Sequence, residues 1–147
     1  MNNFIEYKIL PEIRMIVVCY FGQNRISDIL NHRTILNDEV SYNSNYNMLI
    51  DFRNCQLDID EKDIKTYINY AMASEKMKGT RKIAFLSITP KETVFPYLYS
   101  KNLKHLPFKV NIFSTLKAAI AWLDCSDEDT LRIEDSIKNM NVSLKHV

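Results

Sequence analysis

Apolar runs alternate with amphipathic stretches along this chain, and the alternation predicts its secondary structure. Five runs have the length of strands and are rich in β-branched and aromatic residues. The run Met15–Phe21 is apolar at every position, which is typical of a strand covered on both faces, whereas Phe4–Leu10 alternates like a half-exposed edge strand. The five predicted strands are Phe4–Leu10, Met15–Phe21, Tyr46–Asp51, Ile83–Ile88 and Phe108–Phe113.

Helical spacing of apolar residues fills the intervals between these runs. Gly22–Asn24 and Asn54–Asp58 are predicted to end the second and third strands, and Pro96 is placed in the first turn of its helix. Ser27, Asp60 and Ser114 are the predicted caps of three helices. The predicted helices are Ser27–Asn37, Asp60–Lys78 with Gly79 as the C′ residue that follows it, Thr93–Leu103, Ser114–Leu123 and a tail helix, Asp127–Met140, whose apolar line includes Leu131, Ile133 and Ile137.

This order of elements predicts an α/β fold. Strands that alternate with helices form right-handed crossovers and a mostly parallel sheet covered by helices. Only a short connection at Pro11–Glu12 joins the first two strands, so they are expected to pair antiparallel. We therefore expect a mostly parallel five-stranded sheet with an antiparallel edge strand, helices on both faces, and a C-terminal tail helix.

Composition excludes several classes of function. The 147 residues suit one domain, and the net charge of +1 without a cluster of Lys and Arg argues against nucleic acid. The two glycines, Gly22 and Gly79, are too few for a phosphate-binding loop. Three scattered cysteines form no C-x-x-C pair, so no metal or other cofactor is expected.

The chain is expected to be cytoplasmic. Its first residues, Met1–Glu6, lack the cationic start and apolar stretch of a signal peptide. No apolar run approaches the roughly 20 residues of a membrane span, so no integral membrane segment is expected.

Polar residues follow the predicted strands, and strand ends in a parallel sheet collect at one edge, where ligands bind. The candidate binding residues at this edge are Asp51, Arg53, Ser87, Thr89 and Lys91. Three interpretations remain open for them. They orient a polar ligand, or they are turn and cap residues with Asp51 paired to Arg53. A third, enzymatic interpretation makes Asp51 a general base.

The third predicted helix is apolar on two sides. Val94 and Leu98 share one face, while Phe95, Tyr99 and Leu103 share another. Only one of these two faces can pack on the core, so the other must be buried elsewhere. It forms a homodimer contact, lines a groove for a hydrophobic ligand, or is covered by the tail helix. Phe95 and Tyr99 therefore join the candidate ligand- or partner-binding residues.

Histidine chemistry is not predicted. His32, His105 and His146 fall on different elements, and none neighbours a Cys or Ser in an obvious dyad. They are expected to be solvated surface residues, and no catalytic residue is assigned.

Several landmarks resemble the STAS-type, SpoIIAA-like family, which is grouped with Sec14-like folds, and in particular its uncharacterised bacterial members. They are Gly22 after the second strand, Ser27-Asp28 at the first helix, the strand Tyr46–Asp51, and Ile112-Phe113 followed by Ala118–Leu123. The resemblance covers about residues 4–124, which implies a SpoIIAA-like domain there and a separate tail helix over 125–147.

The resemblance implies a regulatory or binding module. Better-known members carry a Ser, phosphorylated by an anti-sigma kinase, at the start of the helix after the third strand. The corresponding segment here, Leu57–Glu61, has neither Ser nor Thr. We therefore expect a non-catalytic module without this phospho-switch, acting through a protein partner or self-association. The alternatives are a carrier or sensor of a small hydrophobic ligand, as in Sec14-like proteins, and an enzyme that uses Asp51.

Overall fold

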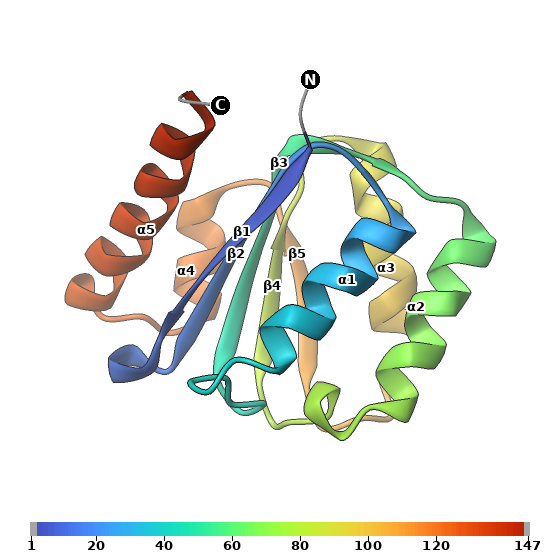
Figure 1. Cartoon of the computed structure of the whole chain (residues 1–147). Helices are drawn as coiled ribbons and strands as arrows, with labels where there is room; N and C mark the ends of the chain where they lie inside the picture. Colours follow the sequence, from blue (N-terminus) through green and yellow to red (C-terminus); the bar gives the residue numbers. More distant parts are fainter. Residues whose placement is uncertain (1–2, 146–147) are drawn as a thin grey trace.

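One five-stranded sheet organises the chain in the computed structural model, which describes residues 3–145 and the side chains of residues 3–141. The strands lie in chain order, β1-β2-β3-β4-β5. β1 is antiparallel to β2, and the other neighbouring pairs are parallel (Figure 1). The mostly parallel sheet with an antiparallel edge strand, predicted from the sequence, is confirmed.

The strands are β1 (Phe4–Leu10), β2 (Met15–Arg25), β3 (Asn47–Asp58), β4 (Lys82–Leu86) and β5 (Lys109–Phe113). The helices are α1 (Ile26–Asn37), α2 (Glu61–Ala73), α3 (Pro90–Asn102), α4 (Leu116–Trp122) and α5 (Asp127–Lys145), with short 3-10 turns η1 (Pro11–Ile13) and η2 (Glu75–Met77).

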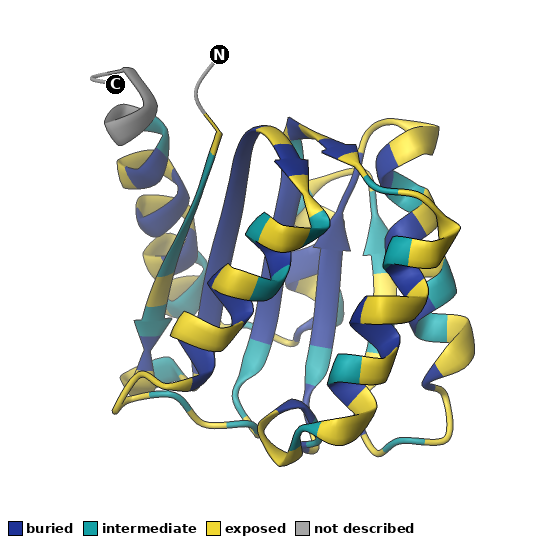
Figure 2. Cartoon of the chain, turned by 45° about the vertical axis from the view of Figure 1, so that its right-hand side comes forward, coloured by how far each residue is buried: buried dark blue, intermediate teal, exposed yellow. Residues whose placement is uncertain are grey.

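Helices cover both faces of the sheet, because the central strands are apolar on both sides. α1, α2 and α3 lie on one face, and α4 and α5 lie on the other (Figure 1). The central strands are buried along most of their length (Figure 2). Within residues 3–145, no helix is both long enough and apolar enough to cross a membrane.

β2 and β3 are longer than the sequence predicted. Gly22 and Asn24 do not end β2, and Asn54–Asp58 is not a loop, because the two segments pair with each other as far as Arg25 and Asp58. The register shifts between Cys19 and Phe21, and Gly22 adopts a φ of 76°, which favours glycine. The extra residue of this bulge lies in β3 between Asp51 and Asn54, and both strands continue to pair past the end of β4.

Helix ends also differ from the sequence predictions. Arg25 rather than Ser27 is the N-cap of α1, and Thr115 rather than Ser114 is the N-cap of α4. Asp60 caps α2 as predicted: the N–H of Asp63 donates to its Oδ1 at 2.8 Å.

Other helix features depart from the predicted pattern as well. α2 ends at Ala73, well before Gly79. α3 starts at Pro90, so Pro96 lies in the helix interior instead of the first turn. In α5, Ile133 and Ile137 pack on the sheet as predicted, but Leu131 is 63% exposed.

His32 is buried, which corrects the prediction of a surface histidine. It is 8% exposed and packs between the rings of Tyr7 and Tyr20, with centroids 5.7 and 5.9 Å away. Burial, reinforced by the positive charge of Arg33, lowers the pKa of His32 to about 3. The imidazole is therefore neutral at pH 7. His105 is exposed after α3, and His146 lies outside the described residues.

β5 is an edge strand, and one of the main-chain groups on its open side is hydrogen-bonded to a side chain of the same strand. Lys109 and Phe113 bond to the chain at β4, so the main-chain groups of Ile112 point away from the sheet. The side-chain Oδ1 of Asn111 accepts the N–H of Ile112 at 2.9 Å. One outward donor of this edge is thus already occupied.

The neutral His32 gives a pH-dependent stability. In the unfolded chain its pKa is about 6.5, so the unfolded state binds a proton more readily than the folded state below that pH. The contribution of the neutral ring is complete above pH 6.5 and is lost as the pH falls toward 3. We expect a slope of at most about 1.4 kcal/mol per pH unit from this residue. Urea unfolding of the wild type and His32→Leu between pH 7 and pH 4 measures the difference. Parallel stability profiles would contradict the assignment.

Candidate functional site

Asp51 and Arg53 form a closed ion pair in the middle of β3. Both side chains project from the same face because they are two residues apart in a strand. The guanidinium donates to Oδ1 and Oδ2 of Asp51 at 3.0 and 2.9 Å, and the backbone N–H of Arg53 donates to Oδ1 at 2.9 Å. These hydrogen bonds raise the pKa of Arg53. Asp51 is 2% exposed, so its carboxylate orients Arg53 and has little access to a ligand.

Ser87 and Thr89 connect β4 to α3 and are engaged in building that turn. The Ser87 hydroxyl lies 2.8 Å from the hydroxyl of Thr93 and 3.2 Å from the carbonyl of Thr89. Thr89 is the N-cap of α3, and its hydroxyl donates to Oε1 of Glu92 at 2.7 Å. Lys91 is exposed in the first turn of the helix. The predicted polar edge thus exists, but its hydroxyls serve the helix start.

Glu92 is a residue that the sequence interpretation missed. It is 4% exposed, and its Oε2 accepts the N–H of Leu57 at 3.4 Å, which ties the start of α3 to the extended part of β3. The Thr89-x-x-Glu92 spacing is the available signal, because this pattern is typical of a helix start.

Phe95 and Tyr99 lie in the core beneath α3. Phe95 stacks near Phe52 at 6.3 Å between centroids, and Tyr99 stacks on Phe108 at 5.8 Å. Both residues are nearly inaccessible, and burial raises the pKa of Tyr99. These two candidate residues therefore shape α3 from below and do not line its outer surface.

The outer surface of α3 forms an apolar groove, named here the α3 groove. Its volume is about 660 Å³. Ile88, Val94 and Tyr97 are 60%, 49% and 55% exposed, although all three are large and apolar or aromatic. The residues that line the groove are Ser87, Ile88, Thr89, Pro90, Thr93, Val94, Tyr97, Leu98 and Ser114.

The α3 groove brings together only part of the predicted set. Ser87 and Thr89 line it, whereas Asp51, Arg53, Phe95 and Tyr99 do not. The Val94–Leu98 face was recognised in the sequence as a second apolar face. The tail helix does not cover it, because α5 packs on the opposite face of the sheet (Figure 1). Of the covers considered from the sequence, the tail helix is therefore eliminated.

Two lysines of α3 stand near the α3 groove. Lys91 stands three residues before Val94, and Lys101 follows Tyr97 by four, so helical spacing places both beside the apolar face. Residues 87–123 contain five lysines and one acidic residue, the buried Glu92. Of these lysines, Lys91 and Lys101 are the two that helical spacing places beside the groove.

Other reactive groups are held in unreactive states. Cys19 and Cys55 are buried free thiols, and burial raises the pKa of Cys55 to about 12, so its nucleophilic thiolate is scarce at neutral pH. In the part of the chain that the structure describes, no three His, Cys, Asp or Glu residues gather into a possible metal site.

Comparisons with known proteins identify the fold. No family model matches the sequence, and no curated protein matches it. A similar solved structure is that of an uncharacterized protein of the DUF3478 family, with a SpoIIAA-like fold, from Shewanella loihica PV-4. The TM-score is 0.57 and the identity 12%, over 84% of this chain and 96% of that one. The resemblance seen in the sequence extends to three dimensions, and this chain has a SpoIIAA-like fold.

Proposed function

We propose that this protein is a non-catalytic binding module and that the α3 groove is its binding site. Residues 4–124 form the binding domain in this proposal, and the tail helix packs on its other side. The three unpaired cysteines suit a reducing compartment such as the cytoplasm.

The exposed apolar face of α3 carries this proposal. Val94 and Tyr97 lie about one helical turn apart, and Ile88 adjoins them at the end of β4, so the three form a continuous surface in the groove. A contiguous apolar surface of this kind marks an interaction site in a soluble domain. Burial of a large apolar side chain contributes about 1.5–3 kcal/mol, which is enough for a few such residues to dominate binding.

The favoured partner is a protein segment with apolar side chains and flanking carboxylates. Lys91 and Lys101 lie on either side of Val94 and Tyr97, and no exposed acidic residue competes with them on α3. Charges at the rim of an interface chiefly set specificity and association rate, while the apolar centre supplies affinity. A second copy of this chain is one form that the partner can take.

The chemistry elsewhere supports binding rather than catalysis. Both carboxylate oxygens of Asp51 accept hydrogen bonds from Arg53, and the Thr89 hydroxyl is used in the cap of α3. The segment Leu57–Glu61 contains no hydroxyl for phosphorylation, and Asp60 serves as a helix cap. Regulation by a phospho-switch at this helix is therefore not part of the proposal.

A second candidate function is the transport or sensing of a small hydrophobic ligand. The specific observation in its favour is the volume of the α3 groove, about 660 Å³, which falls within the range of small-molecule sites. The lysines beside it would match a ligand with an acidic head group, such as a fatty acid.

Val94→Asp tests the binding surface. A carboxylate at the centre of the groove opposes burial, so we expect the amount of partner co-purified from the source cell to fall at least about tenfold. Leu131→Asp is the matched control, because Leu131 is an exposed leucine on α5, across the sheet from the groove. Quantitative co-purification and native mass spectrometry measure the partner or dimer. Equal loss in both variants, or no companion at all, would contradict the proposal.

Decanoate tests the second candidate. If the groove holds an acidic hydrophobic molecule, a saturating concentration of decanoate should raise the melting temperature by about 5 °C. Val94→Asp should remove the rise, and Leu131→Asp should retain it. A melting temperature unchanged by decanoate in the wild-type protein would eliminate this candidate while leaving the protein-partner proposal intact.

If the Asp51–Arg53 pair has a structural role, substitutions of its two members should lower the unfolding free energy by different amounts. Arg53→Met leaves the Asp51 carboxylate, only 3% exposed, with one backbone donor, and should lower the unfolding free energy by about 3 kcal/mol. Asp51→Asn keeps the shape, and Arg53 is 29% exposed and can meet water, so the loss should be nearer about 1 kcal/mol. Urea unfolding measures both. The reverse order of losses, or loss of partner binding in a stably folded Asp51→Asn, would refute this role.

A further inference from the structure

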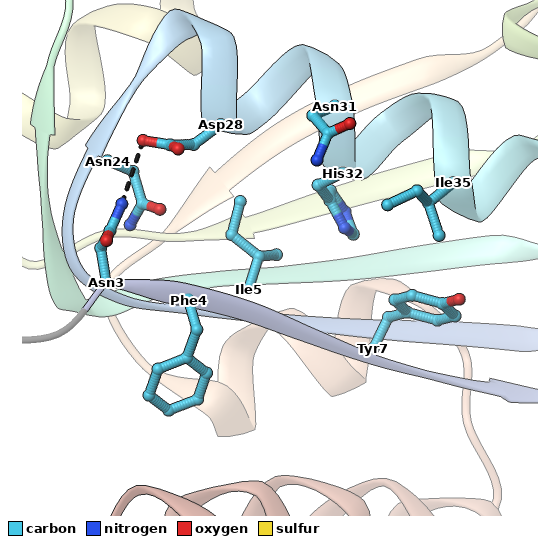
Figure 3. A pocket seen from close by; sticks show the side chains of 9 residues that line it. All are labelled: Asn3, Phe4, Ile5, Tyr7, Asn24, Asp28, Asn31, His32 and Ile35. Atoms are coloured by element: carbon cyan, nitrogen blue, oxygen red, sulfur yellow. Dashed lines mark hydrogen bonds between the residues drawn. The ribbon is translucent and has the colours of Figure 1, made fainter. Parts of the chain in front are cut away.

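A second pocket lies between β1 and α1, separate from the α3 groove and formed by different elements. Its volume is about 240 Å³, roughly that of eight water molecules in the liquid. It is named here the α1 pocket. Figure 3 shows its lining residues: Asn3, Phe4, Ile5, Tyr7, Asn24, Asp28, Asn31, His32 and Ile35.

Asn24 lines this pocket and holds a buried acceptor that has no partner among the described residues. The residue is fully buried, and its amide nitrogen donates to the carbonyls of Phe21 and Gly22 at 3.2 and 3.4 Å. These two bonds determine which end of the amide is nitrogen. Its Oδ1 points away from them and has no donor among the described residues. A buried acceptor without a partner is unfavourable, so a donor on a ligand would be stabilised here.

Asp28 supplies a negative charge at the same end of the pocket (Figure 3). Its Oδ2 accepts the backbone N–H of Arg25 at 2.9 Å and the side-chain amide of Asn3 at 3.1 Å. Both bonds go to one oxygen. Within residues 3–141, Oδ1 of Asp28 receives no further hydrogen bond, so it remains available as an acceptor. Asp28 already occupies the positive N-terminal end of α1, which leaves that end unsuited to an anionic ligand.

The charges around the pocket favour a cation. Asp28 is the one charged side chain in its lining, since His32 is neutral with a pKa of about 3. At the other end, the hydroxyl of Tyr7 donates to Glu39 at 2.5 Å, which adds a second carboxylate behind the pocket. Ile5 contributes an apolar wall between the two ends, and Ile35 contributes one at the Tyr7 end (Figure 3). An anion would meet two carboxylates and no cationic side chain among the lining residues.

We propose that the α1 pocket binds a small primary ammonium compound. The ammonium group donates to Asp28 and to Oδ1 of Asn24, and a short alkyl chain lies along Ile5 and Ile35. An ammonium group has three N–H donors, so it can serve both oxygens at once, and its charge is matched by Asp28. The inference does not depend on the function proposed for the α3 groove.

Three probes of nearly equal size test the assignment: n-butylammonium, n-butanol and butyrate, at matched ionic strength. We expect n-butylammonium at saturation to raise the melting temperature of the full chain by about 5 °C. Butanol and butyrate should give no comparable rise. In amide NMR spectra, the n-butylammonium shifts should concentrate on β1, the start of α1 and the side chain of Asn24.

Two substitutions separate the site from general effects on folding. Asp28→Asn should weaken n-butylammonium binding at least about tenfold, because it removes the matching charge. Asp63→Asn is the control: Asp63 occupies the same position in α2, and it accepts the N–H of Asp60 at 3.0 Å, but it lies outside the pocket. Asn31→Trp fills the pocket from an exposed position and should abolish binding in a folded protein.

The outcomes are decisive in either direction. A rise specific to n-butylammonium that survives Asp63→Asn, weakens in Asp28→Asn and disappears in Asn31→Trp supports the site. Equal responses to the three probes, equal binding in the two Asp variants, or no response by the wild-type protein would overturn it.

Discussion

The parallel pairing of β2 with β3 is the constraint on which the rest of the structure depends. It runs from Met15 opposite Asn47 to Arg25 opposite Asp58, and the bulge near Gly22 divides it into two parts. The first part is the centre of the sheet, to which β1 and β4 add. The second part extends past the end of β4 and leads directly into α1 and α2. Asp51 lies opposite Leu86, where β4 ends, so its pairing with Arg53 holds β3 in place as it leaves that neighbour.

The two faces of the sheet are completed differently. α4 and α5 cover one face, and the buried residues Ile133, Ile137 and Met140 of α5 complete its apolar layer. On the other face, three helices enclose an aromatic core that includes Phe52, Phe85 and Tyr99, yet α3 keeps a second apolar side directed outward. The side of α3 that carries Val94 and Tyr97 thus stays about half exposed.

Strong local patterns predicted most of the fold. The apolar runs at Met15–Phe21 and Met48–Asp51 identify buried strands, and the short link at Pro11 identifies the antiparallel pair. Gly22 and Asn24 resemble a turn in isolation, but their pairing with Cys55 and Leu57 overrides that local preference. The burial of His32 depends on Tyr7 and Tyr20, which are distant in sequence, so helical position alone does not reveal it.

The candidate site could be predicted only in outline. The i, i+2 spacing of Asp51 and Arg53 predicts their pairing, and the spacing of Val94 and Leu98 predicts an apolar face. The contribution of Ile88 depends on how the chain turns after β4, and the burial of Asn24 depends on the packing around the end of β2. These are properties of three-dimensional packing that no local pattern contains.

The bond from Ile112 to the side chain of Asn111 has a consequence for assembly. A strand of another molecule that paired with the exposed edge of β5 would find the N–H of Ile112 already hydrogen-bonded. Lys109 adds a charge to the same strand. Continuous sheet extension from molecule to molecule is thereby discouraged. Molecules that meet at this edge would contact each other through side chains, and such contacts can be reversible and selective. Fibril-like growth, which needs continuous main-chain pairing, is disfavoured.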